Sequence, residues 1–189
     1  MPRSFIAIEF PIEIQNQLLV AISGLSNAFP PPTLRWVKTG NIHLTLKFLG
    51  EVDMKGLAQF ASAIQDKVNG LTPFILSFSE LGLFPGRGLP RILWIGIRPV
   101  PELTTLNASI ESAAEQLGHD RETRPFSPHL TIARVGDRFQ SSRSQELVLA
   151  ARQVDLSRIP SIEVNSVVLF KSDLHPEGPV YSILNSIHF

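Results

Sequence analysis

Short segments in which apolar and polar side chains alternate predict the strands of this chain. Alternation at every second position is typical of a strand with one buried face. Segments of this kind lie at residues 5–10, 34–37, 43–50, 74–84, 92–97, 127–134, 163–171 and 181–189. Stretches rich in glycine and proline separate several of them, and two of these stretches, residues 85–91 and 172–179, are predicted to be loops or turns.

Apolar side chains at helical spacing predict helices elsewhere in the chain. The helical segments are residues 11–27, 53–68, 101–117 and 140–152. Asp53 is a suitable N-cap for the second helix, because its carboxylate can accept a free backbone N–H. Gly118 is a suitable stop for the third, because glycine adopts the left-handed conformation that ends many helices.

The order of these elements indicates the fold class. Strands and helices are mixed, without the regular alternation and glycine-rich first turn of a doubly wound parallel sheet. We therefore expect an α+β fold with two mainly antiparallel sheets and helices on their outer faces. No low-complexity linker or block of charge marks a boundary, so residues 1–189 are expected to form a single domain with two lobes.

The composition narrows the class of protein. The chain has 189 residues, of which 43% are hydrophobic, and this is enough for a packed core. Lys and Arg total 17, as do Asp and Glu, so the chain lacks the basic excess of proteins that coat nucleic acid through phosphate contacts. Any contact with nucleic acid is therefore expected to be local.

The sequence also bears on the compartment. The chain has no cysteine, which excludes disulfides, thiolate metal sites and a thiol nucleophile. The opening MPRSFIAIEF lacks the long apolar segment of an export signal, and no apolar run approaches the roughly 20 residues that span a bilayer. We expect a cytoplasmic protein without membrane contact, and the sequence indicates no obligate protein partner.

A pattern of His, aliphatic, Thr and aliphatic occurs twice. The copies begin at His43 and His129, which are 86 residues apart. Five histidines and eight threonines would produce about 0.2 His-x-Thr triplets by chance, and fewer with aliphatic neighbours. On a strand, the His and Thr of each copy share one face. If the sheets of two lobes face each other, His43, Thr45, His129 and Thr131 converge on one cleft.

These side chains suit the hydrolysis of a phosphodiester. One histidine can take a proton from water while the other gives a proton to the departing ribose oxygen, because the usual pKa of about 6.5 allows one neutral and one cationic ring. The hydroxyls of Thr45 and Thr131 can donate hydrogen bonds to phosphate oxygens. A lone histidine on a strand is usually an ordinary surface or core residue, but two matching copies favour catalysis. A metal site usually needs further ligands, which neither motif has on its face, so no metal or other cofactor is expected.

The segments around the motifs carry a resemblance to a known family. They are RSFIAIEFP, RWVKTGNIHLTLKFLGEV, PRILWIGI, FSPHLTIAR and LFKSDLHPEGPVYSIL. Together they resemble the two-histidine (2H) phosphoesterases, specifically the bacterial and archaeal RNA 2′,3′-cyclic phosphodiesterases, also called 2′-5′ RNA ligases. The resemblance implies a two-lobed α+β fold with a pseudo-two-fold axis, one motif in each lobe and a water-filled groove between them.

The same resemblance implies an activity and a role for each motif residue. The activity is hydrolysis of a 2′,3′-cyclic phosphate to a 2′-phosphomonoester, with RNA ends or cyclic nucleotides as substrates. His43 would be the proton donor to the leaving 3′ oxygen and His129 the base that activates water, while Thr45 and Thr131 would bind phosphate. The paired motif is symmetric by itself, so the assignment of donor and acceptor depends on the resemblance.

Arg134 follows the second motif, where the family pattern places an arginine that can contact phosphate. It is five residues past His129, so an unbroken strand would turn its side chain to the opposite face. Only a bulge or a strand end before Arg134 would return it to the cleft. A salt bridge on the back of the sheet is an equal alternative.

Four further residues are weaker candidates for contacts with RNA. Arg87 and Arg91 lie in the 85–91 segment and could touch an RNA backbone, although exposed arginines are more often only solvated. Phe48 and Tyr181 could stack on a base. In an unbroken strand, however, Phe48 shares a face with the motif leucine, which predicts a core position.

Three kinds of function fit the sequence. The first is the RNA 2′,3′-cyclic phosphodiesterase. The second is a 2′-5′ ligase or a small cyclic-nucleotide phosphodiesterase that uses the same histidines. The third belongs to a different class, a noncatalytic RNA- or nucleotide-binding module, and the presence of both histidines and both threonines argues against it.

Overall fold

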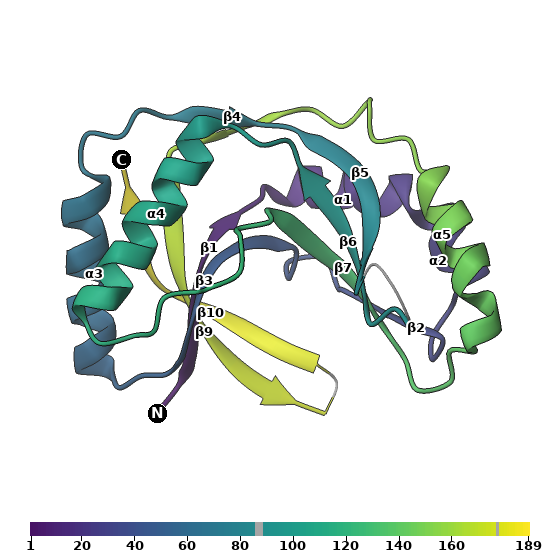
Figure 1. Ribbon diagram of the computed structural model, residues 1–189, viewed down its shortest axis with the longest axis horizontal. Coiled ribbons are helices and arrows are strands. Elements are labelled where there is room, and N and C mark those ends of the chain that lie inside the picture. Colours follow the sequence, from purple (N-terminus) through teal and green to yellow (C-terminus); the bar gives the residue numbers. More distant parts are fainter. Residues whose placement is uncertain (86–88, 177) are drawn as a thin grey trace.

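The computed structural model describes residues 1–85, 89–176 and 178–189 and has an α+β fold, as predicted (Figure 1). The strands are β1 (Arg3–Glu9), β2 (Leu34–Trp36), β3 (His43–Glu51), β4 (Phe74–Leu76), β5 (Phe78–Phe84), β6 (Ile92–Ile97), β7 (His129–Val135), β8 (Ile162–Val164), β9 (Ser166–His175) and β10 (Gly178–His188). The helices are α1 (Ile12–Ala21), α2 (Ser23–Ala28), α3 (Met54–Val68), α4 (Pro101–Gln116) and α5 (Ser144–Arg152), with a 3-10 turn over Ser141–Arg143.

A large antiparallel sheet runs through the molecule. It has eight strands, of which seven follow the order β10-β9-β1-β3-β7-β6-β5, while β2 pairs with β7. The strands β4 and β8 form a separate two-stranded sheet. The antiparallel arrangement agrees with the mixed order of strands and helices along the chain.

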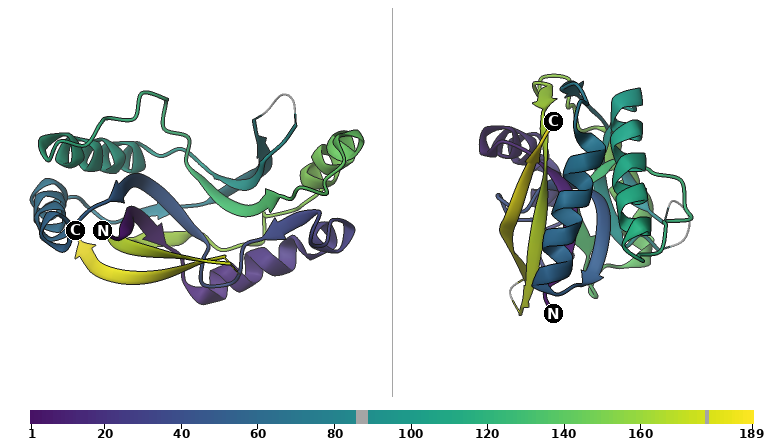
Figure 2. Two further views of the ribbon diagram at one scale, coloured as in Figure 1. Left: turned by 90° about the horizontal axis from the view of Figure 1, so that it is seen from below. Right: turned by 90° about the vertical axis from the view of Figure 1, so that its left-hand side faces the viewer.

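The large sheet has two halves that meet where β3 pairs with β7. Figures 1 and 2 show α3 and α4 at one end of the molecule, near the half formed by β1, β3, β9 and β10. At the other end, α1, α2 and α5 lie near β2, β5, β6 and β7. Each half carries one of the two motifs. The two predicted sheets are thus joined edge to edge through a single pair of residues, Leu44 and Leu130.

The predicted helix ends are confirmed, and four predicted segments differ. Asp53 Oδ1 accepts a hydrogen bond from the Gly56 backbone N–H at 2.7 Å, and Gly118 has a φ of 83° after α4. The predicted strands 74–84 and 163–171 are each divided between the two sheets, as β4 and β5 and as β8 and β9. The predicted 11–27 helix is divided at Ile22 into α1 and α2. Residues 172–175, predicted as a turn, continue β9, because they pair with β10 in a long hairpin.

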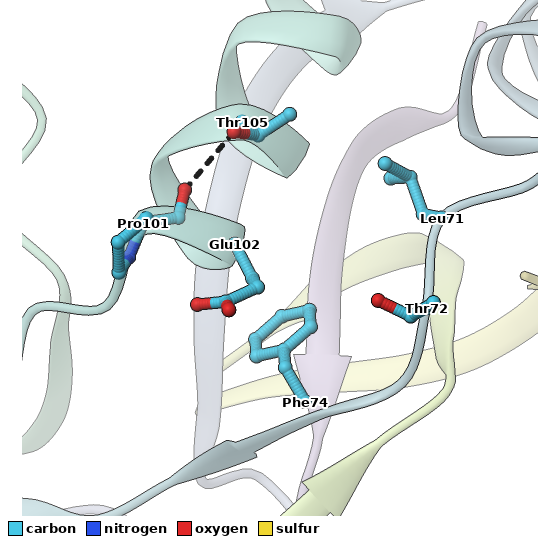
Figure 3. Close-up of a pocket in the computed structure, with 6 residues that line it drawn as sticks. All are labelled: Leu71, Thr72, Phe74, Pro101, Glu102 and Thr105. Atoms are coloured by element: carbon cyan, nitrogen blue, oxygen red, sulfur yellow. Dashed lines mark hydrogen bonds between the residues drawn. The ribbon is translucent and has the colours of Figure 1, made fainter.

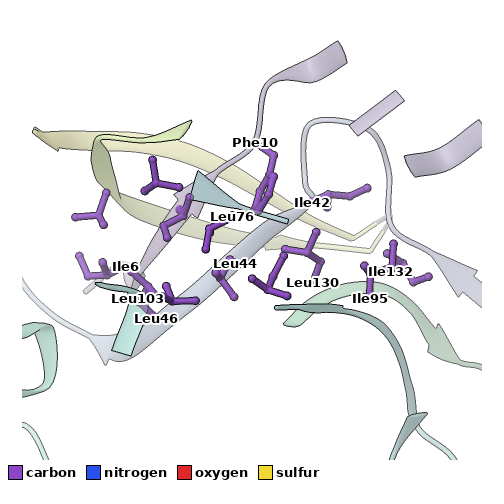
Figure 4. Packing of buried hydrophobic residues seen from close by; sticks show 14 of the residues in the cluster. Ile6, Phe10, Ile42, Leu44, Leu46, Leu76, Ile95, Leu103, Leu130 and Ile132 are labelled. Atoms are coloured by element: carbon purple, nitrogen blue, oxygen red, sulfur yellow. The ribbon is translucent and has the colours of Figure 1, made fainter. Parts of the chain in front are cut away.

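The aliphatic residues of both motifs belong to one hydrophobic core. Leu44, Leu130 and Ile132 are fully buried, and Leu46 is nearly so. They pack in the same cluster, with side chains from β1, β6 and α4 around them (Figure 4). The backs of the two motif strands are therefore held by the same packing. In the part of the chain that the structure describes, no helix combines the length and apolarity needed to cross a bilayer.

Candidate active site

Leu44 of β3 lies directly opposite Leu130 of β7. In an antiparallel pair, the residues on either side of such a position face each other in crossed order. His43 therefore lies on the side of Thr131, and Thr45 lies on the side of His129. The register gathers the four predicted motif residues around one leucine pair and relates the two motifs by a local two-fold axis.

Exposure separates the two faces of the motif strands. The motif leucines are fully buried, whereas the two histidines and two threonines are partly exposed. We call the face of β3 and β7 that carries His43, Thr45, His129 and Thr131 the motif face. The alternation predicted from the sequence is thus present in both strands.

Both motif histidines make the same hydrogen bond. Nδ1 of His43 lies 2.9 Å from the Asn41 carbonyl oxygen, and Nδ1 of His129 lies 2.7 Å from the Ser127 carbonyl oxygen. Because a carbonyl oxygen can only accept, Nδ1 carries the hydrogen in each ring. Nε2 is consequently the atom that is left to exchange a proton with a substrate.

Aromatic side chains enclose His43. Its ring centroid lies 4.8 Å from that of Phe5 and 5.2 Å from that of Tyr181, the latter edge-on. Burial lowers the pKa of His43 from its usual 6.5 to about 4, against a smaller opposing effect of the hydrogen bond to the Asn41 carbonyl. His43 is therefore neutral in the ligand-free protein at pH 7.

His129 has its own aromatic neighbours from the other half of the sheet. Its ring centroid lies 5.0 Å from Phe84 and 6.2 Å from Trp94, both approached edge-on. Trp94 lies opposite Thr131 in the register, and its ring covers Gly82, where any Cβ would overlap the indole. Each histidine thus has one carbonyl partner and neighbouring aromatic rings, and the rings around His43 and around His129 come from different strands.

A β-bulge follows the threonine in each motif. In β3, Thr45 pairs with Ala7 and Lys47 with Ile6, so Leu46 is the extra residue. In β7 the same shift makes Ile132 the extra residue. The two strands consequently share one burial pattern, in which the fourth and fifth motif positions are both buried and the sixth is exposed.

The bulge in β7 decides the position of Arg134. It changes the alternation after Ile132, so Arg134 returns to the motif face and is exposed. The positive charge of Arg134 is close enough to Tyr181 to act on the pKa of that phenol, although burial dominates and raises this pKa. Within the described residues, Arg134 makes no salt bridge, so the alternative of an ion pair on the back of the sheet is absent.

The bulge in β3 corrects the prediction for Phe48. A core position was expected, but Phe48 is 71% exposed and lies on the motif face, with its ring centroid 6.0 Å from that of Phe5. Tyr181 lies beside His43 on the same face. Both aromatic candidates therefore lie near the motifs. Asn41 Nδ2 donates to the Pro179 carbonyl oxygen at 3.1 Å, which ties the β9–β10 hairpin to the loop before β3.

Sequence reasoning missed several residues near the motifs. The rings of Phe5, Phe84 and Trp94 come from strands far from the motifs in the sequence, and only the order of the strands brings them together. Of the two loop arginines, Arg91 is exposed just before β6, and Arg87 lies outside the described residues.

A surface pocket of about 160 Å³ lies elsewhere, beside the first turn of α4 (Figure 3). It is lined by Leu71, Thr72, Phe74, Pro101, Glu102 and Thr105, and it contains none of the motif residues. Among residues 1–85, 89–176 and 178–189, no group of three or more histidine or acidic side chains is placed to hold a metal ion.

A sequence profile described as the 2′-5′ RNA ligase superfamily matches residues 11–176. The chain belongs to this superfamily. Members named RNA 2′,3′-cyclic phosphodiesterase are similar along nearly the whole chain. The protein from Archaeoglobus fulgidus is 33% identical over 187 residues, 96% of this chain and 97% of that protein. The protein from Thermotoga maritima is 30% identical, over 99% of this chain and 95% of that protein.

Two solved structures have the same architecture. Escherichia coli LigT complexed with 3′-AMP matches with a TM-score of 0.74 and 27% identity, over all of this chain and 98% of that one. A protein from Thermus thermophilus matches with a TM-score of 0.76 over 98% of this chain and 97% of that one, at 24% identity. The predicted resemblance to the 2H phosphoesterases is confirmed, together with the fold class.

Proposed function

We propose that this protein hydrolyses 2′,3′-cyclic phosphates at RNA ends to 2′-phosphomonoesters. The observation that carries the proposal is the pairing of Leu44 with Leu130, which gathers two histidines and two threonines on one face. The name RNA 2′,3′-cyclic phosphodiesterase, borne by relatives that are 28–35% identical, supports this choice of reaction. RNA ends are the proposed substrate, and a cytoplasmic location stays a prediction.

The reaction needs one proton removed and one proton supplied. We assign His129 as the base that takes a proton from water as the water oxygen attacks phosphorus. The bond from phosphorus to the 3′ oxygen then breaks, and His43 gives its proton to that oxygen. Thr45 and Thr131 donate hydrogen bonds to the non-bridging oxygens, where negative charge develops.

The low pKa of His43 means that the ring must gain a proton before it can act as the acid. With a pKa of about 4, the free protein holds His43 neutral at pH 7. A phosphate anion beside the ring favours the cationic form and raises this pKa. The bound substrate therefore supplies the charge that makes His43 an acid, and proton uptake accompanies binding.

The decisive experiment uses an oligonucleotide with a 2′,3′-cyclic phosphate in excess chelator. We expect a 2′-phosphomonoester from the wild type and a loss of at least about 100-fold in kcat for His43→Ala and His129→Ala. His188→Ala is the matched control, because His188 is exposed on β10. The activity of this variant should equal that of the wild type. A 3′-phosphate product, or activity that survives both motif substitutions, contradicts the proposed mechanism.

A further inference from the structure

Three arginines line a surface pocket of about 440 Å³ at the end of β7. They are Arg35 on β2, Arg91 just before β6 and Arg134 on β7, and we call this site the arginine pocket. Pro90, Ile92 and Phe139 supply apolar walls, and Asp137 is the acidic residue in the lining.

The strand register explains why the arginines lie together. Arg35 and Arg134 are direct partners across β2 and β7, so their side chains leave the sheet on the same face. Ile92 is the partner of Arg134 on the other edge of β7, which places Arg91 next to it. The carbonyl of Arg91 accepts a hydrogen bond from the Val135 N–H at 2.9 Å, which holds its backbone in place.

The arginine pocket keeps a positive charge, because Asp137 is the one carboxylate in the part of its lining that the structure describes, against three guanidinium groups. Among the described residues, Arg35, Arg91 and Arg134 make no ion pair, whereas Lys47 and Arg143 have carboxylate partners at 2.8 Å and 2.7 Å. Like charges directly opposite each other across two strands repel. In a chain whose net charge is zero, such a cluster favours an anion, and guanidinium groups bind phosphate through two parallel hydrogen bonds.

The arginine pocket continues the motif face. Arg134 is three residues beyond Thr131, but Ile132 is the extra residue of the bulge, so the two residues are spaced like their partners Ile92 and Trp94, about 7 Å apart at roughly 3.3–3.4 Å per residue. The bulge at Ile132 puts both side chains on one face. A ligand that reaches from the motif histidines to the arginine pocket would gain most from a second anionic group, such as a phosphate, near its reacting one.

We propose that the arginine pocket binds the phosphate on the 5′ side of the terminal nucleotide in an RNA that ends in a 2′,3′-cyclic phosphate. This inference rests on the proposed function and sharpens it, because it makes an oligonucleotide end a better substrate than a cyclic mononucleoside. Arg35 and Arg91 are then specificity-determining residues that contact a phosphate outside the reaction itself.

Three substrates separate the effect of the second phosphate from that of a second base. They are a 2′,3′-cyclic mononucleoside, the same compound with a 5′-phosphate, and a dinucleotide with the same cyclic end. For the wild type we expect kcat/KM to rise about tenfold or more from the first to the second, because a charge-assisted contact with phosphate is gained. For Arg35→Ala and Arg91→Ala that gain in kcat/KM should shrink to less than about threefold. On the first substrate, kcat/KM of both variants should stay within about twofold of the wild-type value.

Control variants keep this test interpretable. Arg152→Ala removes an exposed arginine from the last turn of α5, outside the pocket, and should behave as wild type on all three substrates. If Arg35→Ala folds poorly, Arg35→Gln keeps most of the length of the side chain while removing its charge. Equal losses on all three substrates, or no loss on any, overturn the proposal.

A binding measurement distinguishes failure of this proposal from failure of the proposed function. If the wild type hydrolyses none of the substrates, the proposed function fails. The affinity for a labelled oligonucleotide with a 3′-phosphate, measured by fluorescence anisotropy against salt concentration, then tests the arginine pocket directly. Weaker binding with a shallower salt dependence in Arg35→Ala and Arg91→Ala supports the pocket, and unchanged binding overturns it.

Discussion

Leu44 and Leu130 face each other across β3 and β7, and each is followed by a partly exposed threonine and preceded by a partly exposed histidine. The same two residues are fully buried in the core behind the sheet. Packing of this pair therefore holds the two motif strands together and sets the spacing of the four polar side chains.

Leu130→Ala should lower the free energy of unfolding by about 2–5 kcal/mol, because it removes buried methyl groups and leaves a cavity. Urea denaturation followed by circular dichroism measures the change. Leu149→Ala is the control, since Leu149 is 53% exposed on α5, and it should change stability by less than about 0.5 kcal/mol. Similar values for the two variants would contradict the burial of the motif pair.

Stability should depend on pH through His43. Its pKa is about 4 in the folded protein and about 6.5 when unfolded, so the unfolded state binds the proton first as pH falls. Stability is thus lost between about pH 6.5 and about pH 4, by roughly 3 kcal/mol at about 1.4 kcal/mol per pH unit. Compared with the wild type, His43→Asn should show a flatter pH dependence over this window.

The measurement is the free energy of unfolding of wild type and of His43→Asn at several pH values. The difference between the two proteins at each pH isolates His43, because the carboxylates titrate alike in both. His188→Asn serves as the control because this side chain is exposed. Parallel pH curves for wild type and His43→Asn would show that burial does not lower the pKa of His43. Direct NMR titration of the imidazole gives the same quantity independently.

Thr45→Val and Thr131→Val should each reduce kcat by about 100- to 1000-fold while the fold is kept. Valine has the shape of threonine but cannot donate a hydrogen bond to a phosphate oxygen, and loss of one such donor removes stabilisation of the developing charge. Thr104→Val is the matched control, because Thr104 is exposed on α4. A change confined to KM would mean that the hydroxyls bind substrate and transition state equally well.

Replacing one member of the buried ion pair of Lys47 and Glu111 should lower the free energy of unfolding far more than replacing both. Lys47 Nζ lies 2.8 Å from Glu111 Oε2 and 2.6 Å from the Asp120 carbonyl oxygen, and both side chains of the pair are buried. Lys47→Met leaves a buried carboxylate without its cation and should cost about 3–5 kcal/mol. The double variant with Glu111→Leu should recover most of this loss in the same urea assay, and additive losses would contradict the coupling.

Much of the architecture follows from local patterns. Most strand and helix positions, the Asp53 cap and the Gly118 stop were predictable, because side-chain periodicity and capping chemistry act over a few neighbouring residues. The duplicated His-x-Thr motif pointed to the candidate site for the same reason, since alternation on a strand requires only that the strand be regular.

The sequence by itself therefore determined the α+β class, the superfamily resemblance and which face of each motif strand carries His43, Thr45, His129 and Thr131. Only the tertiary structure decided what lies after the motifs. A bulge depends on how two strands distant in sequence pair, so the exposure of Phe48, wrongly expected in the core, and the return of Arg134 to the motif face could not be derived from alternation. The partnership of Arg35 with Arg134 arises from the same long-range register, which no local pattern encodes.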